Sequence, residues 1–257
     1  MRIRACVISH PGKVRPKNED NFFFNEYVRV DEELEKPYKL NCKTDIPLLM
    51  GVFDGMGGIS AGERASLIAA NTARNISYTL YDPDDIDRTM LDICKTSNEV
   101  VCNEMVNLVK GRMGTTASML CFFEDYYHLC NIGDSPIFIF RDSKLTEISY
   151  EHTEKENYVQ IYGAENIPPN KKFRLTQHIG IFPDELEIEP YVSYDKIQNG
   201  DRFIICSDGL TDMVKEPQIA GIMSKRLSPV KTAQILLSRA LDNGGKDNTT
   251  IIVIDVC

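Results

Sequence analysis

The chain has 257 residues, of which 42% are hydrophobic and 26% charged, a composition typical of globular proteins. Lysine and arginine number 29 against 38 aspartate and glutamate residues, so the net charge is −9 and nucleic acid is disfavoured as the main partner. No apolar run reaches the roughly 18–20 residues that a membrane helix requires, and residues 1–13 lack the apolar core of a signal peptide. We therefore expect a cytoplasmic protein with no membrane partner.

Length indicates the number of domains, and cysteine usage indicates the redox compartment. One hydrophobic core can serve a chain of this size, so we expect a single domain over residues 1–257. The eight cysteines form no Cys-x-x-Cys pair, and several lie inside apolar runs. Free thiols in a reducing compartment explain this pattern better than disulfides or zinc.

Strand-like segments dominate the chain, and turn-forming residues separate them. They cover residues 2–9, 22–28, 47–53, 116–123, 126–132, 137–141, 186–192, 202–206 and 249–256. The polar residues 30–45 are expected to form a loop between two strands. The charged residues 152–174 are expected to form a small mobile subdomain.

Capping signals and apolar periodicity predict helices between these strands. The helices are expected from a capping box at Ser60 to about Leu80, from Asp82-Pro83 to before Gly111, over residues 211–223, and from Ser228-Pro229 to Gly244-Gly245. Strands in hairpin succession with helices in pairs favour antiparallel sheets covered by helices over a doubly wound α/β fold.

Acidic residues recur at the ends of the predicted strands. They are Glu19, Asp20, Asp54, Asp134, Asp208 and Asp247. Any one of them is most simply a turn-forming residue. If the strands pack in one sandwich, however, these carboxylates gather at sheet ends, which is costly unless cations neutralise them.

The residue types at these ends indicate a particular chemistry. All-oxygen ligands favour Mg²⁺ or Mn²⁺ over zinc, and Gly55 has no side chain to keep its carbonyl from an ion. A pair of such ions about 3.5–4 Å apart can activate a water for hydrolysis of a phosphate monoester. Arg15, in the loop before Glu19, is placed to bind a phosphate with both guanidinium nitrogens. Taken alone, Arg15 would be read as a surface arginine.

A series of short motifs follows in a fixed order along nearly the whole chain. The motifs are Val14-Arg15 with Asn18-Glu19-Asp20-Asn21, Val52-Phe53-Asp54-Gly55-Met56-Gly57-Gly58, Gly114-Thr115-Thr116-Ala117, Asn131-Ile132-Gly133-Asp134-Ser135, Cys206-Ser207-Asp208-Gly209-Leu210-Thr211-Asp212 and Lys246-Asp247-Asn248-Thr249-Thr250. In this series the chain resembles the metal-dependent protein phosphatases of the protein phosphatase 2C (PPM) family. Met56 resembles the bacterial branch, since some eukaryotic members have histidine there. The resemblance implies an α+β fold, a four-layer α-β-β-α sandwich of two antiparallel sheets flanked by helices.

The resemblance also implies a role for each acidic residue. Asp54 would bridge two metal ions, and the Gly55 carbonyl would bind one of them. Asp208 and Asp247 would complete one metal site, and the adjacent pair Glu19-Asp20 would contact the other, largely through waters.

A weaker third metal site is implied at Asp134, together with Asp208 or Asp212. Pro136 stands where the family usually has arginine, which changes the charge around that site. Residues 152–174 correspond to the flap beside the family's active site.

The implied activity is hydrolysis of phosphoserine and phosphothreonine in proteins, with two or three Mn²⁺ or Mg²⁺ ions as cofactors. The attacking water would bridge two metal ions, and Arg15 and Glu19 would have catalytic roles, with Arg15 binding the phosphate. The expected partners are phosphorylated proteins, the products of a serine/threonine kinase, and the enzyme is expected to be a monomer.

Two other readings remain. A catalytically weak or silent binding module could keep the fold, but it should have lost metal-binding aspartates that are present here. A two-metal phosphodiesterase or nuclease is disfavoured by the acidic balance and by the lack of a basic tract.

Overall fold

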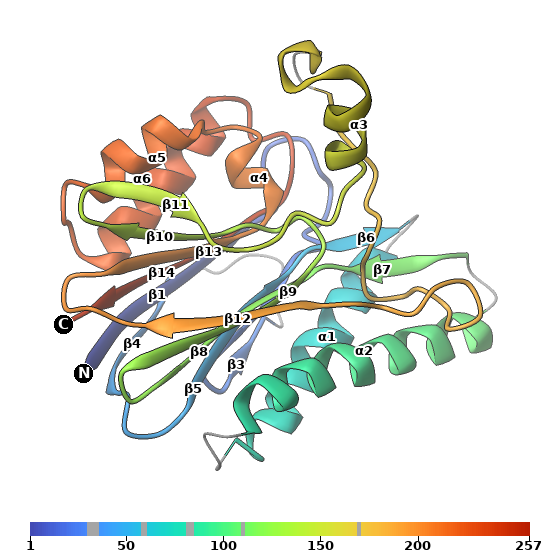
Figure 1. The fold of residues 1–257 in the computed structure, drawn as a ribbon, viewed down its shortest axis with the longest axis horizontal. Coiled ribbons are helices and arrows are strands. Elements are labelled where there is room, and N and C mark those ends of the chain that lie inside the picture. Colours follow the sequence, from blue (N-terminus) through green and yellow to red (C-terminus); the bar gives the residue numbers. More distant parts are fainter. Residues whose placement is uncertain (30–35, 58–60, 81–84, 109–110, 169–170) are drawn as a thin grey trace.

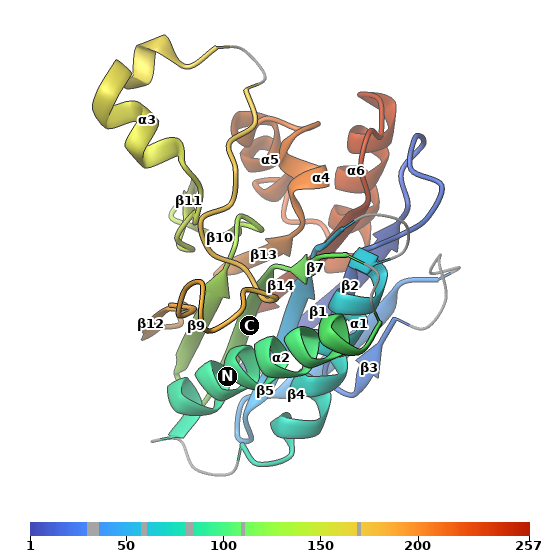
Figure 2. The ribbon, with the colours of Figure 1, turned by 90° about the vertical axis from the view of Figure 1, so that its right-hand side faces the viewer.

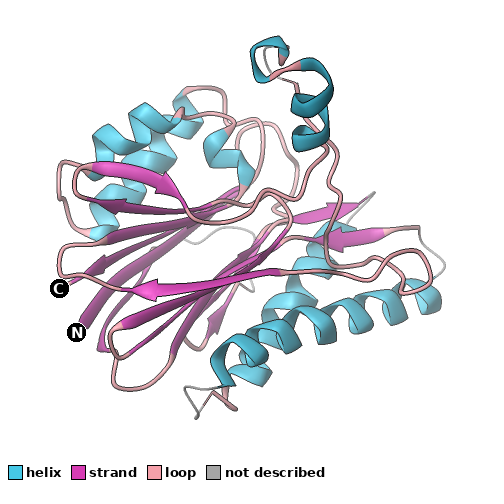
Figure 3. Cartoon of the chain, in the orientation of Figure 1, coloured by secondary structure: helices cyan, strands magenta, loops and turns pink. Residues whose placement is uncertain are grey.

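Two antiparallel six-stranded sheets face each other, and helices cover the outer face of each sheet (Figure 1, Figure 3). The computed structural model describes the whole chain except residues 30–35, 58–60, 81–84, 109–110 and 169–170. The predicted α-β-β-α sandwich is therefore confirmed.

The strands of each sheet come from both halves of the chain. The first sheet has the order β11 (Lys144–Glu147), β10 (Ile137–Arg141), β13 (Arg202–Cys206), β14 (Thr249–Val256), β1 (Arg2–His10) and β4 (Tyr38–Lys43). The second has the order β12 (Tyr191–Lys196), β9 (Tyr126–Ile132), β8 (Ala117–Phe123), β5 (Leu48–Phe53), β2 (Asn21–Phe24) and β3 (Tyr27–Val28). A small sheet pairs β6 (Gly55–Gly57) with β7 (Met113–Thr115).

The helices form two outer layers and one projection. The helices α1 (Ala61–Ser77) and α2 (Ile86–Leu108) lie on the second sheet, whereas α4 (Asp208–Thr211), α5 (Glu216–Met223) and α6 (Pro229–Asp242) lie on the first. The helix α3 (Lys155–Tyr162) and a 3-10 turn, Ala164–Asn166, stand away from the sandwich (Figure 2). No helix in the described part of the chain is long and apolar enough to cross a membrane.

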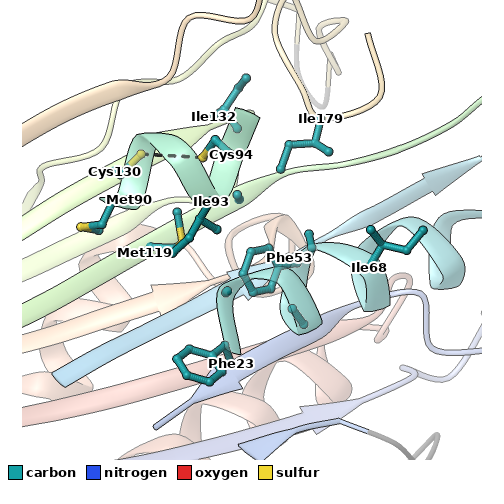
Figure 4. Packing of buried hydrophobic residues seen from close by; sticks show 14 of the residues in the cluster. Phe23, Phe53, Ile68, Met90, Ile93, Cys94, Met119, Cys130, Ile132 and Ile179 are labelled. Carbon is teal, nitrogen blue, oxygen red and sulfur yellow. Dashed lines mark hydrogen bonds between the residues drawn. The ribbon is translucent and has the colours of Figure 1, made fainter. Parts of the chain in front are cut away.

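Apolar side chains fill each space between layers. Phe53, Ile68, Met90 and Met119 pack between the second sheet and its two helices (Figure 4). A separate cluster between the two sheets includes Phe203. Full burial of such side chains contributes about 1.5–3 kcal/mol each, which fixes the relative position of the sheets.

The predicted helix starts are tested in part. Ser228 accepts a hydrogen bond from the backbone N–H of Lys231 (3.4 Å), as expected for the cap of α6, which ends at Asp242. The predicted caps at Ser60 and at Asp82-Pro83 lie outside the described residues.

The predicted loop over residues 30–45 is wrong in its second half, where β4 forms the edge of the first sheet. Leu40 of β4 is opposite Ala5 of β1. The strand was missed because its half-buried side chains alternate with Lys39, Asn41 and Lys43, and polar residues of this kind are common on edge strands.

Three other predicted elements need correction. The strand predicted over residues 22–28 is a hairpin, since Asn25 has a φ of 58° and reverses the chain. The strand predicted over residues 186–192 begins only at Tyr191, after Pro190, which has no N–H to donate. The helix predicted over residues 211–223 begins at Glu216, because Pro217 is tolerated only in a first turn.

Candidate metal centre

The strand register brings distant acidic residues to one edge of the sandwich. Asn21 of β2 is opposite Phe53 of β5, and this is the last residue pair between these two antiparallel strands. Asp20 and Asp54 therefore lie side by side just beyond it. In the first sheet, Cys206 is opposite Ile251, so the chain leaves β13 at the place where it enters β14. The sequence pattern of acids at strand ends therefore does predict their convergence.

Asp20 is buried and only partly satisfied. Its side chain is enclosed, with 1% of the residue exposed, and its Oδ2 accepts a hydrogen bond from the Ser207 hydroxyl (2.7 Å). Its Oδ1 is buried and has no hydrogen-bond partner among the described residues. A buried carboxylate oxygen without a partner is costly, and a bound cation would satisfy it. The residues present thus fit a metal ion at this place.

The backbone around Asp54 is held on both sides. Its N–H donates to the Thr116 hydroxyl (3.0 Å), and its carbonyl accepts from the Thr115 hydroxyl (2.9 Å) and from the Thr116 N–H (2.9 Å). A Cβ at Gly55 would overlap with the carbonyl oxygens of Glu19 and Gly62. Only glycine therefore fits beside Asp54, and the reason is close backbone packing; the expected approach of the Gly55 carbonyl to an ion stays a prediction.

Asn248 ties the loop that carries Arg15 and Glu19 to the start of β14. Its side-chain amide donates to the carbonyls of Pro11 and Lys17 (both 2.8 Å), and its Oδ1 accepts from the Glu19 N–H (2.7 Å). The Arg15 guanidinium donates to Oδ2 of Asp247 (2.8 Å). Arg15 and Asp247, which are 232 positions apart, are thus neighbours.

Asp208 and Asp212 lie at the two ends of α4, and a flap lysine contacts both. The Nζ of Lys172 lies 3.1 Å from Oδ2 of Asp208 and 2.7 Å from Oδ2 of Asp212. Asp134, in the turn after β9, lines the same cavity as Asp208 and Asp212.

Burial and mutual repulsion raise the pKa values of these carboxyls. Burial raises the pKa of Asp20 to about 7, and hydrogen bonds from Ser207 and Thr250 only partly offset it. Burial likewise raises the pKa of Asp134 to about 7, with repulsion by Asp208. The pKa of Asp54 is raised well above its ordinary value, by burial first and then by the charges of Asp20 and the other acids. Such a cluster is a site where divalent cations bind favourably.

The described side chains do not form a closed cage, and no group of three or more acidic, histidine or cysteine residues among them could already hold a metal ion. Two basic side chains contact these acids. Arg15 binds Asp247 and Lys172 binds Asp208, so each basic group competes for a carboxylate.

Sequence reasoning missed four residues that shape this centre. Ser207 and Asn248 each stand next to an aspartate in the quoted motifs, which was the available signal, and Thr116 stands in the motif Gly114-Thr115-Thr116-Ala117. Lys172 carried no such signal.

The comparisons with known proteins agree with this geometry. The sequence profile of the family described as "Protein phosphatase 2C" matches residues 39–243. The chain belongs to the protein phosphatase 2C family.

Relatives in this family are similar over almost the whole chain. The serine/threonine protein phosphatase PstP of Mycobacterium tuberculosis is 30% identical over 99% of this chain and 45% of its own length. The serine/threonine phosphatase stp of Listeria welshimeri is 24% identical over 95% of this chain and 92% of its own length. The chain therefore spans about half of PstP and nearly all of the Listeria protein.

A solved structure has the same fold. It is the catalytic domain of PstP in complex with two manganese ions, with a TM-score of 0.80 and 25% identity over 100% of both chains.

Proposed function

We propose that this chain is a metal-dependent protein serine/threonine phosphatase that hydrolyses phosphoserine and phosphothreonine. One observation carries the proposal: the buried Asp20, with its unpartnered oxygen, lies beside Asp54 at the edge where Asp208 and Asp247 also emerge. Family membership supports the activity, because the similar PstP and stp proteins are named as serine/threonine phosphatases.

The proposed ligands of two Mn²⁺ or Mg²⁺ ions are Asp20, Asp54, the Gly55 carbonyl, Asp208 and Asp247. The two manganese ions of the similar PstP domain support this stoichiometry. When bound, such a pair of hard cations would neutralise charge on the phosphate and activate a water for in-line attack. The chain's own part is to hold the carboxylates rigidly, as Ser207 does for Asp20 and Thr116 for the backbone of Asp54.

Arg15 and Glu19 are the proposed catalytic residues beside these ligands. The Arg15 side chain is 51% exposed and contacts Asp247, so it can reach a phosphate at the rim without leaving the centre. The Glu19 backbone is held by Asn248 and by the Ser66 hydroxyl (2.6 Å), which fixes where its carboxylate can lie.

We propose that residues 1–257 form one phosphatase domain and that residues 152–174 are its flap. A bridge between Thr153 and Leu175 and a hydrogen bond from the Glu154 N–H to the Arg174 carbonyl (2.9 Å) close the base of this excursion. These contacts support treating the intervening residues as one subdomain.

The cellular setting is proposed on chemical grounds. Cytoplasmic action is supported by the cysteines, all of which are free and six of which are buried. The substrates would be phosphoproteins made by a serine/threonine kinase. A monomeric state stays a prediction, which light scattering of the purified protein tests.

Phosphate release from a phosphothreonine peptide and from an aryl phosphate tests the function. We expect turnover with Mn²⁺, loss of turnover with chelator, and at least about a 100-fold loss in Asp54→Asn. The exposed Asp242→Asn is the matched control and should keep wild-type rates. Folded, manganese-bound wild type without turnover on either substrate would instead favour the silent binding module.

A further inference from the structure

The base of the flap is fixed on the sandwich, and Lys172 lies close to that base. Besides the contacts of Glu154 and Thr153, the Thr176 N–H donates to the His152 carbonyl (2.9 Å). His152 is in turn joined through its own N–H to the Gly133 carbonyl (3.0 Å), at the end of β9. The fold therefore sets the position of the chain next to Lys172.

The neighbours of Lys172 face the flap itself. The Nζ of Lys171 lies 4.8 Å from the ring centroid of Tyr158 and 5.2 Å from that of Phe173. The ring of Phe173 packs edge-on against Tyr158, with centroids 5.3 Å apart. Lys171 and Phe173 thus both engage α3, whereas Lys172 between them turns to α4.

The Lys172 ammonium forms ion pairs with the carboxylates that an additional cation would need as ligands. It contacts Oδ2 of Asp208 (3.1 Å) and Oδ2 of Asp212 (2.7 Å). A cavity of about 290 Å³ borders Lys172, Asp134 and both of these aspartates, so the ammonium sits in the space that they share. Burial disfavours the charge of Lys172, but the two carboxylates outweigh burial and raise its pKa.

The third metal ion that the family resemblance implies does not fit these contacts. A divalent cation within about 4 Å of an ammonium is strongly repelled in a partly buried site. Pro136, in place of arginine, adds no charge to replace or oppose the lysine.

We propose that Lys172 acts as a built-in cation, which holds the flap to Asp208 and Asp212 and takes the place of a third metal ion. The proposal rests on the two-metal function proposed above. A divalent ion can enter between Asp134 and Asp212 only when the lysine leaves, so the chain operates with two metal ions.

Manganese binding, measured by electron paramagnetic resonance of the free ion into the millimolar range, tests the proposal without relying on activity. We expect two equivalents for wild type. Lys172→Gln, which keeps much of the side-chain length but removes the charge, should gain a third site at least about tenfold tighter than any third site of wild type. Lys171→Gln is the matched control, and it should bind two.

Each outcome decides the matter. Three equivalents in wild type, or only two in folded Lys172→Gln, would overturn the proposal. A third ion that persists in Lys172→Gln/Asp212→Asn would also overturn it, because the added site would lie elsewhere. Failure of the first two ions to bind is a different result, since it would contradict the proposed phosphatase function.

Discussion

The hydroxyl of Ser207 donates a 2.7 Å hydrogen bond to Oδ2 of Asp20, a residue 187 positions away in the chain. Ser207 also accepts a hydrogen bond from the backbone N–H of Thr250 (3.0 Å). One hydroxyl therefore joins the ends of β13 and β14 in the first sheet to the start of β2 in the second. Oδ1 of Asp20, which has no hydrogen-bond partner among the described residues, is left for a cation.

Substitution Ser207→Ala should destabilise the chelated protein by about 1–3 kcal/mol, because it removes a hydrogen-bond donor from the buried Asp20 carboxyl. Urea unfolding measures the effect. Ser224→Ala, at an exposed position after α5, should change the unfolding free energy by less than about 0.5 kcal/mol. Equal small effects at both serines would mean that the Ser207–Asp20 contact does not hold the centre.

Substitution Asp54→Asn should have opposite effects on stability and on metal response. The amide removes a group whose ionisation is opposed by burial and by the charge of Asp20, so the chelated variant should melt at a higher temperature than wild type above pH 7. Addition of Mn²⁺ should raise the melting temperature of wild type much more than that of the variant. An equal manganese shift in both proteins would remove Asp54 from the metal centre.

The chelated protein should lose stability as the pH rises from about 4 to about 7. Burial raises the pKa of Asp20 from its ordinary 3.8 to about 7 in the folded state, and that of Asp134 likewise. Between these pH values the folded state therefore binds more protons than the unfolded state. The free energy of unfolding falls as the pH rises through this window, because deprotonation favours the unfolded state.

Thermal unfolding at pH 5 and pH 8 measures this dependence. The melting temperature should be lower at pH 8, and Mn²⁺ should restore it, because cations can replace the protons. A melting temperature that rises toward pH 8 in chelator would contradict the raised pKa values.

Substitutions at Arg15 should separate charge from geometry. Arg15→Ala should lower kcat/KM for a phosphothreonine peptide by about 10- to 100-fold, because a loss of this size corresponds to the free energy that hydrogen bonds to a charged group contribute. Arg15→Lys should recover only part of this loss, since an ammonium cannot bind a phosphate with two parallel donors. Arg88→Ala, exposed on α2, is the control, and a comparable loss there would discount a specific role for Arg15.

Much of the scaffold could be predicted because buried strands appear in the sequence as apolar runs. The strands β9, β10, β13 and β14 have the predicted bounds, since each is a nearly continuous apolar run between polar turns. The apolar runs of β5 and β13 also placed Asp54 and Asp208 near strand ends, where the structure has them. The strand β4 was missed because its inward side chains are only half buried and lysines separate them.

The contacts that complete the centre could not be predicted from the sequence. Lys172 reaches an aspartate 36 positions away only because the flap base is anchored near β9. Arg15 was expected to face a phosphate, and its contact with Asp247 follows from the way in which Asn248 holds the loop. Neither partner is marked by periodicity or by local turn chemistry.

Anomalous diffraction at the manganese absorption edge, from crystals grown with Mn²⁺, tests the central claim most directly. We expect two strong peaks between Asp20, Asp54, Asp208 and Asp247, with the Asp54 carboxylate next to both. Manganese bound on another face of the protein, with no peak among these four side chains, would contradict it.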